Sequence, residues 1–523
     1  ADQRAGRAGR QAPGICLRLW PAYETATLAE RETPEIARVD LAGPALQLLA
    51  WGETDLAAFG WFESPSPESL AAAVQLLRQL GAFDHVVTSL GSTMARLPVH
   101  PRLARLLIAG QRAGRTREAA LLAALLAERD PFLRSSVRGA GPRRSSRSDL
   151  LDRLDSLESF ERRQGFDGET LNAGAARFVL WARDQLAEMA RRELAEASGD
   201  SGDDDALLRA LLAAYPDRVA RRREPRSPRG VMVGGRGVRL AEESAVLEAE
   251  LFLCVELDAS RGGEALVRKA SAVEPEWLAA DRLRTAIDLE FDESRERVAA
   301  WKRTRYDDLV IAEAEVPAPK TTETERVLVQ AAADCLDRAL ALDDPEVAGF
   351  LARVRSLAEW RPELELPRFT DGEIRDLLPA LAAGRKSFAE LRRAPLLDVL
   401  QGALSYIQLA ALGREAPERL EVPSGSHVKL HYEPGKPPVL AARIQELFGL
   451  EETPRVAAGR IPVLLHLLAP NGRPQQVTHD LRSFWTNTYP QVRKELQGRY
   501  PRHAWPMDPW NARPERRPAR RSK

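Results

Sequence analysis

The chain has 523 residues, too long for a single hydrophobic core, and this length predicts about three to five domains. Hydrophobic residues make up 44% and charged residues 29%, as in globular proteins, and no apolar run reaches the roughly 18 residues that a membrane helix needs. The 76 basic residues balance the 76 acidic ones, which argues against unselective capture of nucleic acid by the whole molecule.

The chain opens with ADQRAGRAGR, in which Gln3, Arg7 and Arg10 are spaced by four and then three residues. On a helix this spacing places the three side chains on one face. Gly6 and Gly9 remove Cβ atoms beside that face, so another surface or a ligand can approach the backbone closely. The two guanidinium groups suit a polyanion such as a triphosphate, but a solvated basic helix would show the same spacing.

The stretch SPSPESLAAAVQLLRQLGAFD predicts an amphipathic helix, with Ser66 as N-cap, Pro67 at the first helical position and Gly81 at the C-cap. The next run, HVVTSLGSTMARL, is β-prone and places Gly91 at a turn. Helices followed by a small hairpin predict a winged-helix module. Residues 101–196 then show helical spacing, interrupted by a polar, basic loop at 134–149.

The acidic stretch ASGDSGDDDA marks a domain boundary, and the β-like runs RGVMVGGRGVRLA and ELFLCVELDAS after it predict a small barrel. Beyond residue 276 the pattern predicts helices around 280–304, 322–342 and 387–412, followed by hairpins. The final RRPARRSK is a basic tail.

Eight arginines lie between residues 218 and 239, where Asp217 and Glu224 are the nearby acids. Such a stretch on a barrel predicts a groove for single-stranded nucleic acid, with Tyr215 as the main aromatic for base stacking; a solvated arginine loop is the alternative. The candidate nucleic-acid contacts are Arg218, Arg221, Arg222, Arg223, Arg236 and Arg239.

Metal and disulfide chemistry are not predicted. The three cysteines are far apart with no C-x-x-C pair, which favours a reducing cytoplasm. His427 and His431 fall on an expected strand, where a spacing of four separates them by about 13 Å, too far to share one metal ion. The aromatic segment FWTNTYPQVRKELQGRYPRHAWP predicts a core wrapped by a proline-rich loop rather than a docking surface.

Several of these segments carry a resemblance. QRAGRAGR is similar to motif VI, Q-R-x-G-R-x-G-R, of superfamily 2 helicases of the DEAH/RHA type. TPEIARVDLAGPALQLLAWG resembles the entry to that family's winged helix, MARLPVHPRLARLLIAG its helical ratchet domain, and AAYPDRVARRR the start of its OB-fold. PVLLHLLAPNGRPQQVTHDLRSFWTNTYP resembles the C-terminal extension of the bacterial HrpB subgroup of ATP-dependent RNA helicases.

The resemblance implies a multidomain, mainly α fold with α+β and small β-barrel parts. The implied division is 1–20, the end of the second RecA-like domain; 21–95, a winged helix; 96–205, the ratchet domain; 206–275, an OB-fold; 276–380, a helical connecting region; 381–513, the HrpB-type domain; and 514–523, the tail.

The resemblance also implies an ATP-dependent RNA helicase that uses ATP and Mg²⁺, with Arg7 and Arg10 reaching the γ-phosphate and Gln3 positioning water. Single-stranded RNA is the implied partner, DNA is left open, and no membrane is expected. The 523 residues contain no G-x-x-x-x-G-K-[ST] loop and no D-E-x-H box, so we expect the missing N-terminal RecA-like domain to be a partner and the chain alone to be ATPase-inactive. A non-catalytic nucleic-acid-binding scaffold is the alternative.

Overall fold

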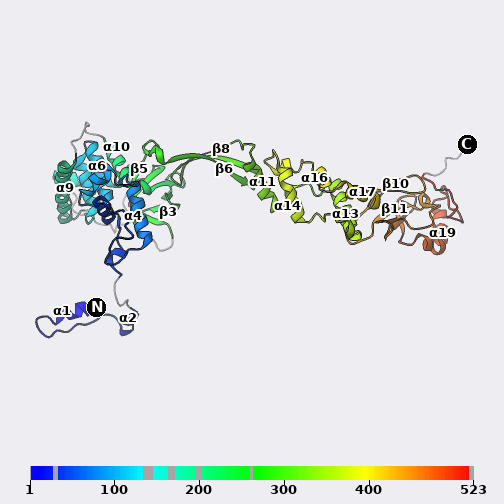
Figure 1. Ribbon diagram of the computed structural model, residues 1–523, viewed down its shortest axis with the longest axis horizontal. Helices are drawn as coiled ribbons and strands as arrows, with labels where there is room; N and C mark the ends of the chain where they lie inside the picture. Colours follow the sequence, from blue (N-terminus) through cyan, green and yellow to red (C-terminus); the bar gives the residue numbers. More distant parts are fainter. Residues whose placement is uncertain are drawn as a thin grey trace. The chain divides into compact units, whose positions relative to one another are not determined.

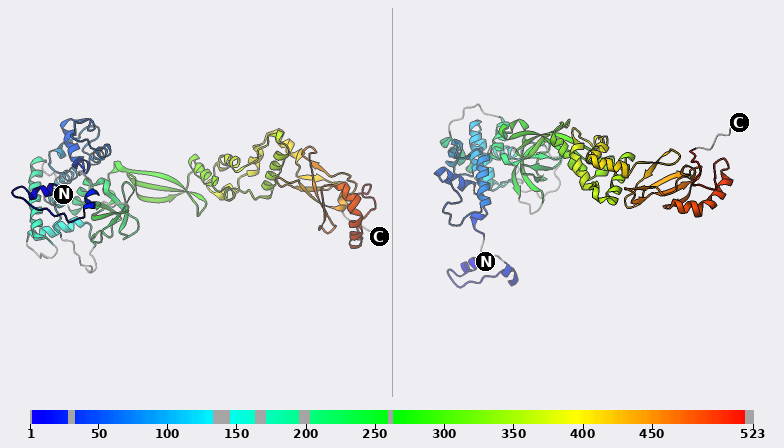
Figure 2. Two further views of the ribbon diagram at one scale, coloured as in Figure 1. Left: turned by 90° about the horizontal axis from the view of Figure 1, so that it is seen from below. Right: turned by 45° about the vertical axis from the view of Figure 1, so that its right-hand side comes forward.

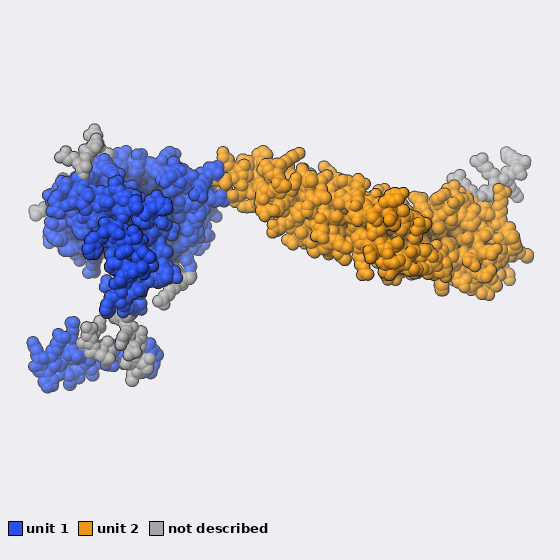
Figure 3. All heavy atoms as spheres, in the orientation of Figure 1, with its two compact units in different colours: residues 1–285, 304–312 blue, residues 286–303, 313–523 orange. Residues whose placement is uncertain are grey.

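The computed structural model describes residues 2–27, 33–132, 145–162, 171–194, 203–258 and 263–516, with the backbone alone for 2–4, 22, 25 and 26. The chain divides into two compact units (Figure 3). Unit 1 comprises residues 1–285 and 304–312, and unit 2 comprises residues 286–303 and 313–523.

Unit 1 begins with two short helices, α1 (Asp2–Ala8) and α2 (Ala22–Thr27), and a helical cluster follows. This cluster consists of α3 (Ala42–Trp51), α4 (Pro67–Gln79) and α5 (Ser89–Ala95), which share one hydrophobic core. The predicted ends of α4 are confirmed, because the Ser66 side chain accepts a hydrogen bond from the Ser69 amide at 3.1 Å and Gly81 has a φ of +73°.

The hairpin predicted after α4 is wrong, because residues 89–95 form helix α5 and an isolated bridge between Phe83 and Val87 precedes it. The Thr88 hydroxyl caps this helix by accepting a hydrogen bond from the Gly91 amide at 2.9 Å. A Cβ atom at position 91 would lie 1.9 Å from the Ala82 carbonyl oxygen. Gly91 therefore allows a helix to pack closely against the preceding turn, rather than forming a turn itself.

A larger helical cluster follows, as predicted, with α6 packed against both α7 and α10, and α7 packed against α9 (Figure 1). The helices are α6 (Pro101–Arg112), α7 (Thr116–Ala127), α8 (Asp149–Glu161), α9 (Ala173–Glu193) and α10 (Asp204–Ala214). Most of the loop predicted at 134–149, through residue 144, lies outside the described residues, as does most of the acidic boundary, through residue 202.

The predicted barrel is confirmed as a closed five-stranded barrel in the order β1-β2-β3-β5-β4. Its strands are β1 (Val219–Arg222), β2 (Arg229–Met232), β3 (Arg236–Leu240), β4 (Leu251–Asp258) and β5 (Ala265–Val273). The β3–β5 pair is parallel and the other pairs are antiparallel. Val238, Phe252 and Val267 are fully buried in its core.

A buried carboxylate attaches helix α8 to the barrel. Asp149 accepts hydrogen bonds at 2.8 Å from the Ser244 hydroxyl and from the Ala245 and Ala270 amides. Burial raises the pKa of the Asp149 carboxyl, and these three donors offset the effect only in part. Helix α8 is thus fixed to two separate segments of the barrel.

The helix predicted around 280–304 is wrong, because this region forms strands of a three-stranded sheet (Figure 2). The strands are β6 (Leu283–Asp292), β7 (Arg297–Tyr306) and β8 (Leu309–Val316), and the division between the units falls within them. Arg303 on β7 is hydrogen-bonded to Asp288, Glu290 and Glu313 on the neighbouring strands. Cross-strand charge pairs of this kind hold an exposed sheet together, and they are not visible as sequence periodicity.

Unit 2 continues with helices around one core, as predicted for 322–342 and 387–412. They are α11 (Thr322–Ala333), α12 (Leu336–Ala339), α13 (Pro345–Trp360), α14 (Asp371–Ala382), α15 (Phe388–Leu391), α16 (Leu396–Gly402) and α17 (Tyr406–Glu415). Among the described residues no single helix has the length and apolar character to span a membrane; only α16 and α17 taken together, bent by 108°, meet that criterion.

The last part of unit 2 is a five-stranded sheet in the order β15-β14-β11-β10-β9, together with a two-stranded sheet and a helical cover. The elements are β9 (Arg419–Glu421), β10 (His427–His431), β11 (Val439–Arg443), β12 (Arg455–Val456), β13 (Ile461–Pro462), β14 (Leu464–Leu468), β15 (Pro474–Thr478), α18 (Leu481–Ser483) and α19 (Tyr489–Arg499). Trp485, Tyr489 and Trp505 are buried in the hydrophobic core that these elements share, which confirms the predicted aromatic core. Most of the predicted tail, from residue 517, lies outside the described residues.

Candidate functional site

The first predicted group, Gln3 with Arg7 and Arg10, lies in and just after α1. Positions 3 and 7 are one helical turn apart, whereas Arg10 lies two residues beyond the end of the helix. Arg7 and Arg10 are exposed, and the side chain of Gln3 lies outside the described residues. A Cβ atom on Gly6 or Gly9 would meet no described atom within 4 Å, so the space beside these glycines is open.

In the second group, strand register divides the barrel arginines between two faces. Ala220 opposes Met232, and both are buried in the barrel core. Because alternate residues of a strand share a face, Arg222 points inward with Ala220. By the same alternation Arg221, Arg229 and Arg239 point outward, since Arg221 opposes Val231 and Arg229 opposes Arg239.

Arg222 is 5% exposed, and its guanidinium group is occupied within the barrel. It donates hydrogen bonds to the carbonyl oxygens of Ala249 and Val246, both at 2.9 Å, and to that of Ser227. The guanidinium carbon lies 5.3 Å from the centre of the Phe252 ring. Arg222 therefore closes one end of the barrel and presents no free surface to a phosphate.

Arg218 is held in a similar way, together with the residues around it. It donates a hydrogen bond to the Val255 carbonyl oxygen at 2.7 Å. Its guanidinium carbon and that of Arg102 lie 5.2 and 4.9 Å from the centre of the Tyr215 ring, which is 6% exposed. The prediction that Tyr215 stacks on a base is therefore wrong, because arginines and helices already cover the ring.

Arg102, on α6, also forms a two-pronged ion pair with Asp217, at 2.7 Å for each bond. Burial raises the pKa of the Asp217 carboxyl, but the hydrogen bonds and charge of Arg102 outweigh burial and hold the pKa below its usual value. Asp217, at the start of the arginine-rich stretch that was predicted to bind nucleic acid, thus anchors the barrel to the helical cluster.

Four surface arginines of the barrel are paired with acids that are distant in sequence. Arg221 pairs with Glu250 at 3.0 Å, Arg226 with Glu248 at 3.2 Å, and Arg223 and Arg229 with Glu264 at 3.7 and 3.2 Å. Exposed pairs of this kind stabilise a fold by about 0 to 1 kcal/mol, so a phosphate can replace the carboxylate. These ion pairs could not be predicted from the local sequence, because the acids are distant along the chain and the fold of the barrel brings them to the arginines.

Arg236 and Arg239 are exposed and form no ion pair within the described part of the chain. Arg239 also lines a cavity of 470 Å³, together with Arg268, Glu242 and Glu243. Among the six predicted nucleic-acid contacts, Arg236 and Arg239 are therefore the arginines whose charge is least neutralised by carboxylates.

Comparison with known proteins shows which proteins this chain is similar to. The family described as "ATP-dependent helicase C-terminal" matches residues 377–509, and "Helicase associated domain (HA2), winged-helix" matches residues 73–99. The chain is 31% identical over 98% of its length to the ATP-dependent RNA helicase HrpB of Escherichia coli. Over nearly its whole length the chain is therefore similar to an HrpB-type DEAH/RHA helicase.

The HrpB-like chain spans 60% of the length of the E. coli protein. It also matches the E. coli ATP-dependent RNA helicase HrpA, with 39% identity over 25% of this chain and 11% of HrpA. The human probable ATP-dependent RNA helicase DHX34 is 38% identical over 29% of this chain and 14% of its own length. A crystal structure of the E. coli DExH-box NTPase HrpB superposes with a TM-score of 0.47 at 30% identity, covering 99% of this chain and 60% of that one.

Proposed function

We propose that this HrpB-like chain is the C-terminal part of an ATP-dependent RNA helicase in which ATP hydrolysis drives movement along RNA. The observation that carries the proposal is the match to the E. coli RNA helicase HrpB along 98% of the chain. A relative that shared only the winged-helix segment would support much less, because accessory domains occur on many proteins.

The domain division stated above is part of this proposal. The barrel order β1-β2-β3-β5-β4, closed and with β3 parallel to β5, supports an OB-fold within residues 206–275. The helical cluster α6 to α10 supports the ratchet domain, and the match at residues 73–99 supports the winged helix. The connecting region 276–380 is proposed as part strand and part helix, since β6 to β8 lie in it.

Arg7 and Arg10 would contact the γ-phosphate of ATP, and Gln3 would position the attacking water. Both arginines are exposed, as partners of a nucleotide held on a facing domain must be. ATP with Mg²⁺ would need a phosphate loop and an acidic metal ligand, and neither motif occurs in these 523 residues. We therefore propose that the chain by itself does not turn over ATP.

Single-stranded RNA would contact the barrel through its surface arginines. Arg221, Arg223, Arg236 and Arg239 stay in the proposed contact set, whereas Arg218 and Arg222 are reassigned to holding the barrel together. Because the Tyr215 ring is buried, it is not available to stack on a base. The proposed contacts are therefore to phosphates, and the affinity for RNA would fall as the salt concentration rises.

RNA-stimulated ATP hydrolysis tests the proposal. We expect no turnover above background by the isolated chain, and turnover when an in-frame upstream segment with a phosphate loop and D-E-x-H box is included. In that longer enzyme, Arg7→Ala and Arg10→Ala should each lower kcat by about 10³ without changing RNA affinity. ATP turnover by the chain alone would contradict the proposal, and the absence of any such upstream segment would favour the non-catalytic scaffold.

A further inference from the structure

The five-stranded sheet of unit 2 has one buried face and one face open to solvent. On the buried face, Leu430, Leu440 and Leu465 are at most 2% exposed and pack against α18, α19 and the aromatic core. On the opposite face every residue of the described strands is exposed or half-buried. A sheet with one uncovered face is a platform on which another molecule can lie.

Strand register identifies the members of the open face. Arg419 on β9 opposes Lys429 on β10, and His427 opposes Glu421. His431 opposes Val439 on β11, which places Ala441 and Arg443 on the same face by alternation. The parallel pairing of β11 with β14 then adds His466 and Leu468, and β15 adds Val477.

This open face has an excess of positive charge. Three cations, Arg419, Lys429 and Arg443, are exposed, and within the described ranges none of them forms an ion pair. Glu421 is the carboxylate that the register places among them. Three of the seven histidines of the chain, His427, His431 and His466, lie on the same face and add ring N–H donors.

Acids border the open face at two edges. Glu346 and Glu418 line a cavity of 470 Å³ that lies between α13 and the end of β10. At the other edge, burial lowers the pKa of His503, and the nearby charges of Glu515 and Arg443 raise and lower this pKa, respectively. The positive charge is therefore concentrated on the strands, and carboxylates lie at both edges of the face.

Aliphatic side chains separate the charges. Val439, Ala441, Leu464 and Leu468 are half-buried, and Val477 is 48% exposed. Cations interleaved with apolar surface match a single-stranded nucleic acid, which offers phosphates for the cations and flat bases for the apolar groups. A purely acidic peptide such as polyglutamate would satisfy the charges but would leave the aliphatic surface uncovered.

We infer that the open face of the β9–β10–β11–β14–β15 sheet is a second binding surface for single-stranded RNA, separate from the barrel. This inference rests on the proposed function, because it assumes that RNA is the ligand of the protein. Arg419, Lys429 and Arg443 contact phosphates, and the aliphatic residues of β11 and β14 contact bases.

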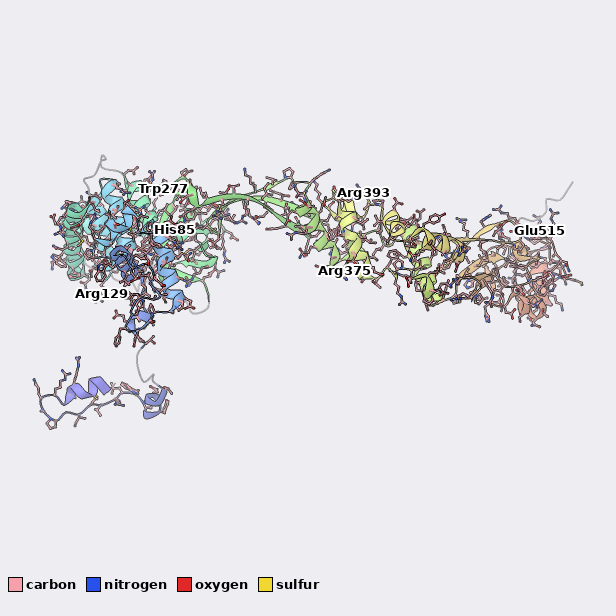
Figure 4. The ribbon with its side chains drawn as sticks, viewed as in Figure 1. His85, Arg129, Trp277, Arg375, Arg393 and Glu515 are labelled. Atoms are coloured by element: carbon pink, nitrogen blue, oxygen red, sulfur yellow. The ribbon has the colours of Figure 1, made fainter. Side chains whose placement is uncertain are left out.

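The test measures binding of fluorescent oligouridylate to the full chain, for wild type and for an Arg419→Ala/Lys429→Ala/Arg443→Ala variant. Losing three phosphate contacts should weaken binding about tenfold or more and lower the slope of log K against log salt by about 2. A matched control, Arg393→Ala/Lys494→Ala/Arg502→Ala, removes the same charge from exposed sites of unit 2 off this face and should leave the slope unchanged (Arg393 is labelled in Figure 4).

Ultraviolet cross-linking to the same oligonucleotide, at concentrations that saturate each protein, identifies the segments that touch RNA. We expect cross-linked peptides from β10 and β11 in wild type and their loss in the sheet variant. If the sheet variant binds like wild type while Arg236→Ala/Arg239→Ala weakens binding, the inference is wrong and the proposed function stands. If wild type does not bind RNA, the proposed function fails as well; equal losses of RNA and polyglutamate binding would overturn the choice of RNA.

Discussion

In the barrel of unit 1, eight arginines lie between residues 218 and 239, and the fold hydrogen-bonds two of them to backbone carbonyl oxygens and pairs four with acids. In the sheet of unit 2, Arg419, Lys429 and Arg443 are spread over 25 positions, and within the described ranges none is in an ion pair. The difference shows that density of charge along the sequence is a poor guide to charge available for a ligand. Strand alternation and long-range acid partners decide that availability.

The largest expected effect tests the buried side of this comparison. Arg222→Ala removes the donor for three carbonyl oxygens inside the barrel, so we expect the free energy of unfolding to fall by about 4 kcal/mol. Urea unfolding monitored by circular dichroism measures it. The outward-facing Arg239→Ala should change the same quantity by no more than about 0.5 kcal/mol. Equal losses for the two variants would contradict the division into faces.

The pair between Arg102 and Asp217 should give the next largest effect. Asp217→Asn should lower the free energy of unfolding by about 3 kcal/mol at neutral pH. The Arg102 side chain is only 8% exposed, and in this variant it would keep its charge without a carboxylate partner. Since the pKa of Asp217 is lowered below 3.8 in the folded state, this contribution is complete above 3.8 and is lost as pH falls through the folded pKa. Thermal unfolding of both proteins from about pH 7 to pH 3 should therefore show a shrinking difference. A difference independent of pH would contradict the ion pair.

The exposed side of the comparison predicts an effect on binding rather than on stability. Arg236→Ala/Arg239→Ala should weaken binding of single-stranded RNA about tenfold at moderate salt, since both cations lack a carboxylate partner in the described ranges. Fluorescence anisotropy measures the affinity, and the unfolding midpoint should stay within about 2 °C of wild type. A variant that unfolds early would place these residues in the fold instead.

The smallest expected effect has the opposite sign. Glu264 pairs with both Arg223 and Arg229, so Glu264→Gln should release two cations and tighten RNA binding by about threefold. The same anisotropy titration measures the change. Weaker binding by this variant would show that Glu264 positions the arginines for RNA rather than competing with it.

Much of the fold could be predicted because its signals are local. Ser66, Pro67 and Gly81 mark the ends of α4 through capping chemistry that acts within one helical turn. The strands and glycine turns of the barrel were visible for the same reason. The prediction that Gly91 forms a turn was wrong. Gly91 instead allows close contact with the Ala82 carbonyl, and Ala82 lies outside residues 85–97, so this contact could not be predicted from that segment alone.

The candidate site was predicted less completely, for a related reason. Arg222 and Arg239 look alike in sequence, and they differ only in which side of a strand they occupy once the register with β2 is set. The acids Glu248, Glu250 and Glu264 come from segments that fold back onto the barrel. The cation cluster on the open face of the unit 2 sheet gave no sequence signal, because its members come from three separate strands.

The salt dependence of RNA binding tests the central claim most directly. For Arg236→Ala/Arg239→Ala, the slope of log K against log salt should fall by about 1.4 relative to wild type, whereas Arg112→Ala/Arg177→Ala, which removes two exposed arginines of α6 and α9, should leave it unchanged. That result would show that the two exposed barrel arginines without a carboxylate partner contact phosphate. Equal slopes for wild type and the barrel variant would contradict the account.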